Sequence, residues 1–280
     1  MSERIKVALI GNPNTGKSSV FNLLTGLQQK TGNYPGITVE KKEGFCRLTK
    51  ELSATIFDLP GTYSLNASSL DENVVIELLM NRKHKDFPDV AVIVADIENI
   101  KRNLLLFTQI KDLGIPSILV VNMSDRMRRK GISLDVEMME QQLNTKIVLT
   151  STLKKKGIDT LKTQIANYIQ LENSSCLDFS DIDPDYFASL QKTFPNQSIY
   201  KLWLVITQDV NFANIDRNTI QSTDGDHTRL TSFLKRLQQR ETIKRYQFIN
   251  EVLKKSLQIN REQATDFQSR LDRILTHRFW

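Results

Sequence analysis

The chain has 280 residues, of which 40% are hydrophobic and 25% are charged, and its net charge is +6. That length allows about two domains, and no run approaches the ~20 apolar residues that a membrane-spanning helix needs. Its two cysteines, Cys46 and Cys176, lie far apart without a CxxC pair, which argues against a disulfide scaffold or a zinc site and favours a reducing compartment.

The first expected elements are a strand at 5–10 and a helix at 17–26, joined by the sequence GNPNTGKS. Met1–Arg4 leads directly into the strand, so we expect no signal peptide. Backbone N–H groups of a glycine-containing turn at a helix N-terminus can surround phosphate oxygens. In this motif the lysine brings positive charge to the outer phosphates, and the serine after it can ligate Mg²⁺. The pattern predicts a nucleoside triphosphate site formed by Gly11, Asn12, Pro13, Asn14, Thr15, Gly16, Lys17, Ser18 and Ser19.

Residues 31–40 contain two glycines, a proline and Thr38, and they show no hydrophobic periodicity. Segments of this kind are ordered by a γ-phosphate and its Mg²⁺ in the switches of GTP hydrolases. We expect Gly36 and Ile37 to contact the nucleotide and Thr38 to complete the metal shell.

The next strands are expected at 40–48 and 52–58, and the second one ends in the sequence DLPG. The Asp58 carboxylate would hold Mg²⁺ through water, and the Gly61 amide would face the γ-phosphate. Ras-type enzymes place a glutamine after this glycine to orient the attacking water. Thr62 stands there in this chain, so no side-chain amide is available at that position.

The sequence Asn-Met-Ser-Asp at 122–125 follows an apolar strand expected at 117–122. The Asp125 carboxylate can accept two hydrogen bonds from the ring N–H and the exocyclic amine of guanine, a donor pair that adenine lacks. An isolated NxxD is most often a turn, but this one follows the phosphate loop and Asp58 in the expected order. The base is therefore predicted to be guanine, bound by Asn122, Met123, Asp125, Ser151, Thr152 and Leu153.

Strands and helices alternate as far as residue 170. Besides those above, we expect strands at 89–96 and 146–149 and helices at 71–83, 100–113, 134–143 and 157–170. This alternation predicts an α/β domain, with a mostly parallel six-stranded sheet covered by helices on both faces. The arrangement resembles a Ras-like P-loop GTPase domain, in which ligands bind at the carboxyl ends of the strands.

After residue 170 the composition changes, since only one of the eleven glycines, Gly225, follows Gly157. We expect an all-α helical bundle over 171–280, connected through the acidic segment Asn173–Asp185. Tyr200–Ile206 fits a short apolar helix or a strand, and helix is the favoured of the two. Apolar residues recur there at helical spacing. They are Leu230, Phe233, Leu234 and Leu237, then Phe267, Leu271, Ile274 and Leu275.

Several stretches resemble one family across the whole length of the chain. They are GNPNTGKSSVFNLLT at 11–25, GNYPGITVE at 32–40, DLPGTYSL at 58–65, Asn122–Asp125, Arg245-Tyr246 with Ile249, and SRLDRILTHRFW at 269–280. The combination of the second and third stretches is far more specific than the general GTPase motifs. On these residues the chain resembles the cytoplasmic N-terminal region of the ferrous iron transport protein B (FeoB) family.

The resemblance implies a GTP-hydrolysing G domain over 1–170 and a regulatory domain over 171–280 that resembles a guanine-nucleotide dissociation inhibitor. The chain would be the cytoplasmic domain of a bacterial inner-membrane protein that transports Fe²⁺. Its partners would be its own transmembrane region, absent from this chain, and small Feo accessory proteins. No nucleic acid is expected.

In cation-activated GTPases an asparagine at the position of Asn14 helps to bind K⁺, which bridges the phosphates as an arginine would. The resemblance thus implies slow, K⁺-stimulated hydrolysis of GTP to GDP with Mg²⁺ bound. The catalytic groups would be Asn14, Lys17, Thr38 and Gly61, with Ser18, Thr38 and Asp58 at Mg²⁺ and Asn14 at K⁺. Met123 and Thr152 depart from the wider GTPase pattern, which bears on nucleotide affinity and release.

Two alternatives stay open at this stage. An RNA-associated GTPase of ribosome assembly or tRNA modification can share the asparagine-bearing loop. Assembly proteins of that kind often append a KH domain, which needs a GXXG clamp, and a tail whose single glycine is Gly225 cannot build one. The second alternative is a structural switch that binds GTP without hydrolysing it.

Overall fold

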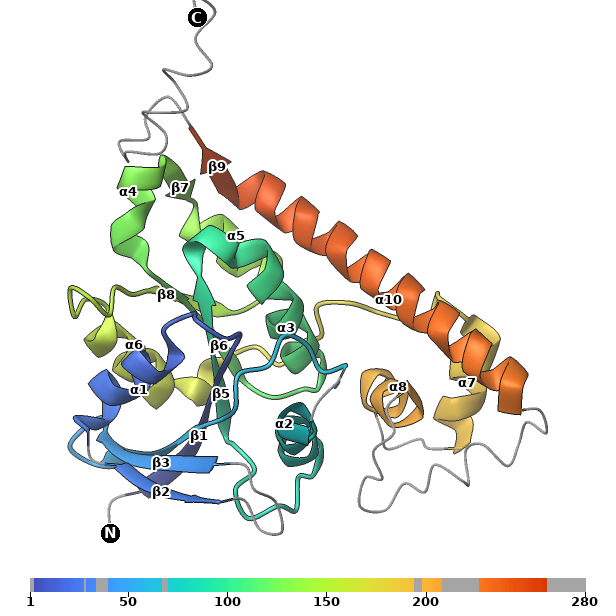
Figure 1. Ribbon diagram of the computed structural model, residues 1–280, viewed down its shortest axis with the longest axis horizontal. Helices are drawn as coiled ribbons and strands as arrows, with labels where there is room; N and C mark the ends of the chain where they lie inside the picture. The colour runs from blue at the N-terminus through green and yellow to red at the C-terminus, as the bar shows by residue number, and fades with distance from the viewer. Residues whose placement is uncertain are drawn as a thin grey trace, which may run out of the picture.

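The computed structural model describes residues 3–27, 29–33, 40–66, 70–193, 198–207 and 227–260. Its centre is a seven-stranded sheet in the order β2-β3-β4-β1-β5-β6-β8, with helices on both faces (Figure 1). Strands β4, β1, β5, β6 and β8 are parallel, and β3 is antiparallel to both β2 and β4. The strands are β1 (Glu3–Gly11), β2 (Gln29–Asn33), β3 (Glu40–Arg47), β4 (Leu52–Asp58), β5 (Val90–Asp96), β6 (Ser117–Asn122) and β8 (Lys146–Leu149). The α/β class and the mostly parallel sheet are confirmed.

The expectation of six strands was wrong, because β2 adds a seventh at one edge of the sheet. It runs from the Gln29–Gly44 pair to the Asn33–Glu40 pair along β3. All five residues of β2 are exposed, so no alternation of buried and exposed positions marks the strand in the sequence. Backbone pairing alone places it there.

The sheet is buried on both faces, as its apolar strands predict. Along β1, Val7 and Leu9 join the core beneath α1 and α6, whereas Ala8 and Ile10 join the core beneath α2, α3 and α5. These helices are α1 (Lys17–Thr25), α2 (Leu70–Met80), α3 (Ile100–Asp112), α5 (Val136–Leu143) and α6 (Ile158–Ala166). The parallel strands all end at one edge of the sheet, so the sequence motifs that follow them converge there.

The helices in the described part of the tail are α7 (Pro184–Thr193), α8 (Ile199–Thr207) and the long helix α10 (His227–Ser256). The helix expected at Tyr200–Ile206 is confirmed as α8. Helix α10 runs along α3 and α5 (Figure 1), and its apolar residues join the same core as those helices.

A second, two-stranded sheet joins the chain's two halves. Strand β7 (Ile132–Leu134) follows the short helix α4 (Met127–Lys130) and pairs antiparallel with β9 (Leu257–Ile259) at the end of α10. The apolar repeat expected at 267–275 lies outside the described residues. Within the described chain, no helix combines the length and the apolar character needed to cross a membrane.

Candidate functional site

The loop between β1 and α1 has the shape that the sequence predicts. Gly16 precedes α1 with φ +83°, and Asn14 also has positive φ, at +67°. Such backbone angles favour glycine and, less strongly, asparagine. The Thr15 hydroxyl donates to the Asn12 carbonyl at 2.9 Å and so closes the turn from inside. Asn14 and Pro13 lie exposed on the outer side of the loop.

Three side chains converge at the start of α1. Lys17 forms an ion pair with Asp58, whose side chain is only 4% exposed, and the Ser18 hydroxyl donates to the other Asp58 oxygen at 3.2 Å. Asp58 reaches this place because β4 lies parallel to β1, with Leu9 opposite Asp58. A Mg²⁺–triphosphate carries charge of both signs, so its phosphates fit Lys17 and its cation fits the carboxylate and the serine hydroxyl. The residues present therefore fit a magnesium-bound triphosphate.

The segment after Asp58 packs against the phosphate loop. The Thr62 amide donates to the Gly11 carbonyl at 3.3 Å, and a Cβ on Gly61 would lie 3.2 Å from the Pro13 ring. The Thr62 hydroxyl donates to Glu72 Oε1 at 3.1 Å. Thr62 is thus buried and bonded to α2. Glu72 cannot be recognised from the sequence, because nothing in its spacing relates it to a motif.

Asn122, at the end of β6, links the phosphate loop to the loop after β8. Its Nδ2 donates to the Thr15 carbonyl at 3.0 Å, and its Oδ1 accepts from the Thr150 hydroxyl at 3.1 Å and the Thr152 amide at 3.2 Å. The Asn122 side chain is fully buried. It therefore holds two loops together from inside.

Asp125 lies near the surface on the same side of the sheet. Its Oδ1 accepts a hydrogen bond from the Ser151 hydroxyl. This bond lowers the pKa of Asp125 below its ordinary value, against a smaller opposing effect of burial. Met123, with φ +61°, turns the chain between β6 and this carboxylate, and the Leu153 side chain is exposed. An ionised carboxylate at this place can accept two N–H donors of a guanine ring.

The structure thus brings together most of the residues that the sequence predicted. The phosphate loop, Lys17, Ser18 and Asp58 lie at one end of the sheet, and Asn122 connects them to Thr152. Ser19 is exposed one residue further along α1. Three further expected contacts lie outside the described residues, namely Gly36, Ile37 and Thr38.

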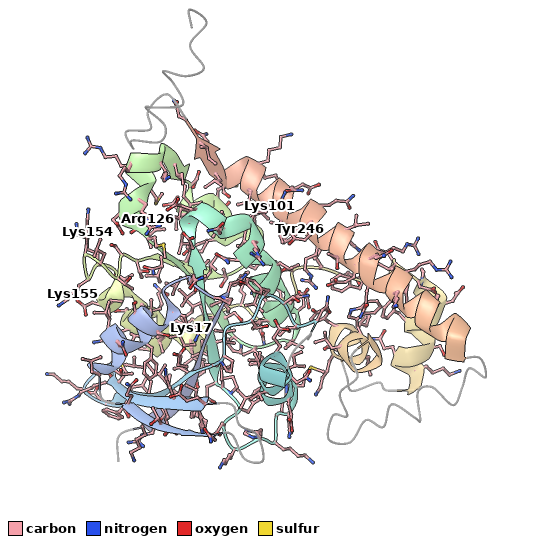
Figure 2. The ribbon with its side chains drawn as sticks, viewed as in Figure 1. Lys17, Lys101, Arg126, Lys154, Lys155 and Tyr246 are labelled. Atoms are coloured by element: carbon pink, nitrogen blue, oxygen red, sulfur yellow. The ribbon has the colours of Figure 1, made fainter. Side chains whose placement is uncertain are left out.

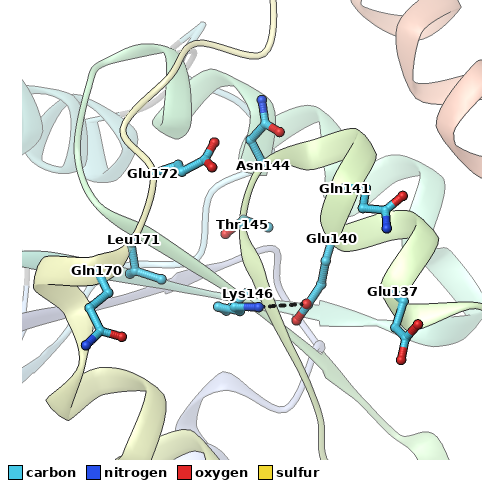
Figure 3. A pocket seen from close by; sticks show the side chains of 9 residues that line it. All are labelled: Glu137, Glu140, Gln141, Asn144, Thr145, Lys146, Gln170, Leu171 and Glu172. Carbon is cyan, nitrogen blue, oxygen red and sulfur yellow. Dashed lines mark hydrogen bonds and ion pairs between the residues drawn. The ribbon is translucent and has the colours of Figure 1, made fainter.

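A separate cavity of about 510 Å³ lies at the opposite end of β8, between α5 and the chain after α6 (Figure 3). Glu140 forms an ion pair there with Lys146 at 3.1 Å and also accepts from the Ile147 amide at 2.8 Å. Lys146 is the first residue of β8, whereas the predicted nucleotide contacts Ser151–Leu153 follow the last residue of that strand. This cavity is therefore distinct from the phosphate site.

Comparison with known proteins points to one family. A family model described as "Ferrous iron transport protein B" matches residues 5–165. The Fe(2+) transporter FeoB of Leptospira biflexa is 42% identical over 160 residues, which cover 57% of this chain and 23% of that protein. FeoB of Escherichia coli K12 is 34% identical over 198 residues, covering 69% of this chain and 25% of the relative. This chain thus spans about a quarter of the length of these relatives.

Solved structures are similar over nearly the whole chain. The cytosolic domain of T. maritima FeoB in a GDP form aligns with a TM-score of 0.78 at 27% identity, covering 92% of this chain and 100% of that one. The sheet matches that of a Ras-like G domain. The family match covers more than half of the chain and includes the phosphate loop, Asp58 and Asp125. The chain therefore belongs to the ferrous iron transport protein B family.

Proposed function

We propose that the chain binds GTP with Mg²⁺ and hydrolyses it slowly. The observation that carries this proposal is the convergence of Lys17, Ser18 and Asp58 behind the loop, while Asn122 bonds to Thr15 of the same loop. Lys17 and the backbone N–H groups of the loop would bind the phosphates. A related cytosolic domain is known in a GDP form, which supports a guanine nucleotide.

The proposed contacts follow from chemistry at each place. Ser18 would ligate Mg²⁺ directly and Asp58 through water, with Thr38 completing the shell. Asp125 would select guanine, and the Ser151–Leu153 loop would cover the base. The Gly61 amide would face the γ-phosphate, close to the place where Gly61 packs on Pro13.

Hydrolysis would depend on K⁺ bound at Asn14. Thr62 bonds to Glu72 and offers no amide to orient water, so another source of transition-state stabilisation is needed. Asn14 is exposed at the outer rim of the loop, with φ +67°. A cation bridging the phosphates there would act as an arginine finger does, which is worth ~10³–10⁵ in rate when fully placed.

We also propose that this chain is the cytoplasmic part of a bacterial inner-membrane Fe²⁺ transporter. The names of its relatives support this role. The match to this family argues against the alternative of an RNA-associated GTPase. Residues 1–170 would form the G domain. Residues 171–280 would form a helical domain that tunes nucleotide affinity and passes the switch state to the transmembrane region, with Feo accessory proteins as further candidate partners.

Phosphate release tests the enzyme proposal. The rate from Mg²⁺–GTP is measured in K⁺ and in Na⁺ at matched ionic strength, for the parent chain and for Asn14→Ala. We expect K⁺ to accelerate the parent and not the variant. Equal rates in the two salts would remove K⁺ from the mechanism, and no release in either would leave a switch that only binds.

A further inference from the structure

Helix α3 touches the segment after Asp58 and the helical tail at the same time. Gln109 of α3 is fully buried, and its Oε1 accepts from the Leu65 amide at 2.8 Å. Leu65 lies four residues after Gly61, whose amide would face the γ-phosphate. The Gln109 carbonyl oxygen therefore fixes the end of the segment that the nucleotide would move.

The other end of the Gln109 side chain lies toward the tail. Its Nε2 and the hydroxyl of Tyr200 in α8 are both buried, and within the described residues neither atom has a complete hydrogen bond. The Tyr200 hydroxyl is nevertheless close enough to the Gln109 amide for that amide to affect its pKa. Burial raises the pKa of Tyr200 well above its ordinary value, and Arg245 and the Gln109 amide oppose that rise. The Gln109 amide N–H is a donor and the Tyr200 oxygen can accept, so the two unpaired buried groups are complementary.

Tyr200 is held in place by a buried charge cluster. The guanidinium of Arg245 in α10 lies 5.0 Å from the Tyr200 ring centroid. Arg245 is fully buried and donates to Glu241 at 2.8 Å and to Asp112 at 2.7 Å. Asp112 lies three residues after Gln109, on the same face of α3. One helical turn of α3 thus holds Leu65 through Gln109 and the tail through Asp112.

A second contact between α3 and α10 lies at the start of α3, away from Gln109 and Asp112. The Lys101 ammonium is 6.0 Å from the Tyr246 ring centroid, and the two residues face each other across the helix pair (Figure 2). Tyr246 is adjacent to Arg245 in sequence but contacts the other end of α3. It provides a tyrosine in the same interface without a link to Leu65.

We propose that Gln109 is a positioning residue for the segment Gly61–Leu65 and that the tail senses this segment through the Tyr200 hydroxyl. The inference rests on the proposed GTP function. When a γ-phosphate pulls on Gly61, Leu65 moves the Gln109 amide, and the bond between Nε2 and the Tyr200 hydroxyl forms. Coupling of this kind is reciprocal. The tail therefore alters the affinity of the switch for GTP through Tyr200, Gln109 and Leu65.

A double-mutant cycle in the full chain tests the proposal. Gln109→Met keeps the side-chain volume and removes both polar atoms, Tyr200→Phe removes one hydroxyl, and Tyr246→Phe is the matched control. The affinities for GDP and for a non-hydrolysable GTP analogue are measured with Mg²⁺, together with KM and kcat. Circular dichroism and thermal melting verify folding.

We expect Gln109→Met to weaken analogue binding by about 3- to 10-fold, the size of one net hydrogen bond, while GDP affinity changes less than about twofold. Tyr200→Phe should lower analogue affinity by a smaller factor, and the double variant should lose no more than Gln109→Met alone. The loss should fall on KM for GTP more than on kcat.

Additive losses would overturn the link between Gln109 and Tyr200, and so would equal effects of Tyr200→Phe and Tyr246→Phe. Parallel losses for GDP and the analogue would reduce Gln109 to a structural role. If the parent chain itself bound neither nucleotide, the proposed function would fall first. Normal parent binding with unaffected variants would overturn the inference alone.

Discussion

Replacing Gly16 by alanine should separate folding from nucleotide binding. The residue has φ +83°, and an added Cβ would lie 2.3 Å from Nδ2 of Asn122, too close for any real contact. The left-handed backbone costs a non-glycine residue about 1–2 kcal/mol. Displacing Asn122 also breaks its bond to the Thr15 carbonyl, worth about 0.5–1.5 kcal/mol.

The loop can relieve this strain by leaving the shape that surrounds phosphates, so the cost falls mainly on binding. A total of about 2–3 kcal/mol corresponds to roughly 30- to 150-fold weaker binding of GDP. Gly26→Ala is the matched control, since Gly26 has φ +62° and nothing lies within 4 Å of an added Cβ. Gly26→Ala should lose about 1–2 kcal/mol of stability in urea unfolding, the cost of the left-handed backbone angle, and it should bind GDP normally.

The assay is displacement of a fluorescent GDP analogue, alongside urea unfolding of both variants. If Gly16→Ala bound GDP within twofold of the parent, the close approach of the phosphate loop and Asn122 would be refuted. Equal binding losses in both variants would show that only the backbone angle matters.

Three further outcomes follow from named groups. Asp125→Asn should bind xanthosine diphosphate better than GDP, because the asparagine N–H group matches the carbonyl that replaces guanine's amine; competition assays with the two nucleotides check this, and retained preference for GDP would contradict it. Burial raises the pKa of Cys46, and it raises the pKa of Cys176 to about 12, so folding favours both protonated thiols. Stability should therefore fall as pH rises above about 9, the ordinary thiol value, and thiol reagents at pH 8 should react slowly until the chain is unfolded; fast labelling of the folded chain would refute this. Asn14→Ala should lose the K⁺ effect on phosphate release while keeping GDP affinity within about threefold, since the Asn14 side chain is exposed on the loop; a retained K⁺ response would exclude Asn14.

The predicted fold was most accurate where burial requires a mostly apolar sequence. The strands at 5–10, 89–96 and 117–122 are mostly apolar because both faces of the sheet are covered. Strand β2 has five exposed residues and no apolar run. Strands β7 and β9 have three residues each, and their pairing joins residues more than 120 positions apart, which local patterns cannot reveal.

The same division applies to the site. Lys17, Ser18 and Asp58 were predictable because each has a fixed place after a strand or in a loop motif. Gln109, Glu72 and the pairing of Arg245 with Asp112 were not, since these side chains act through contacts that only the folded chain creates. The family resemblance includes Arg245, but the sequence does not indicate that its partner is Asp112.

The central claim is that one pocket binds a guanine nucleotide by its phosphates and its base. Isothermal titration of the full chain with GDP, GTP and ATP in the presence of Mg²⁺ tests it most directly. We predict saturable binding of GDP and GTP with one nucleotide per chain, and no measurable binding of ATP at the same concentrations. Absence of GDP and GTP binding, or equal binding of ATP, would contradict the account.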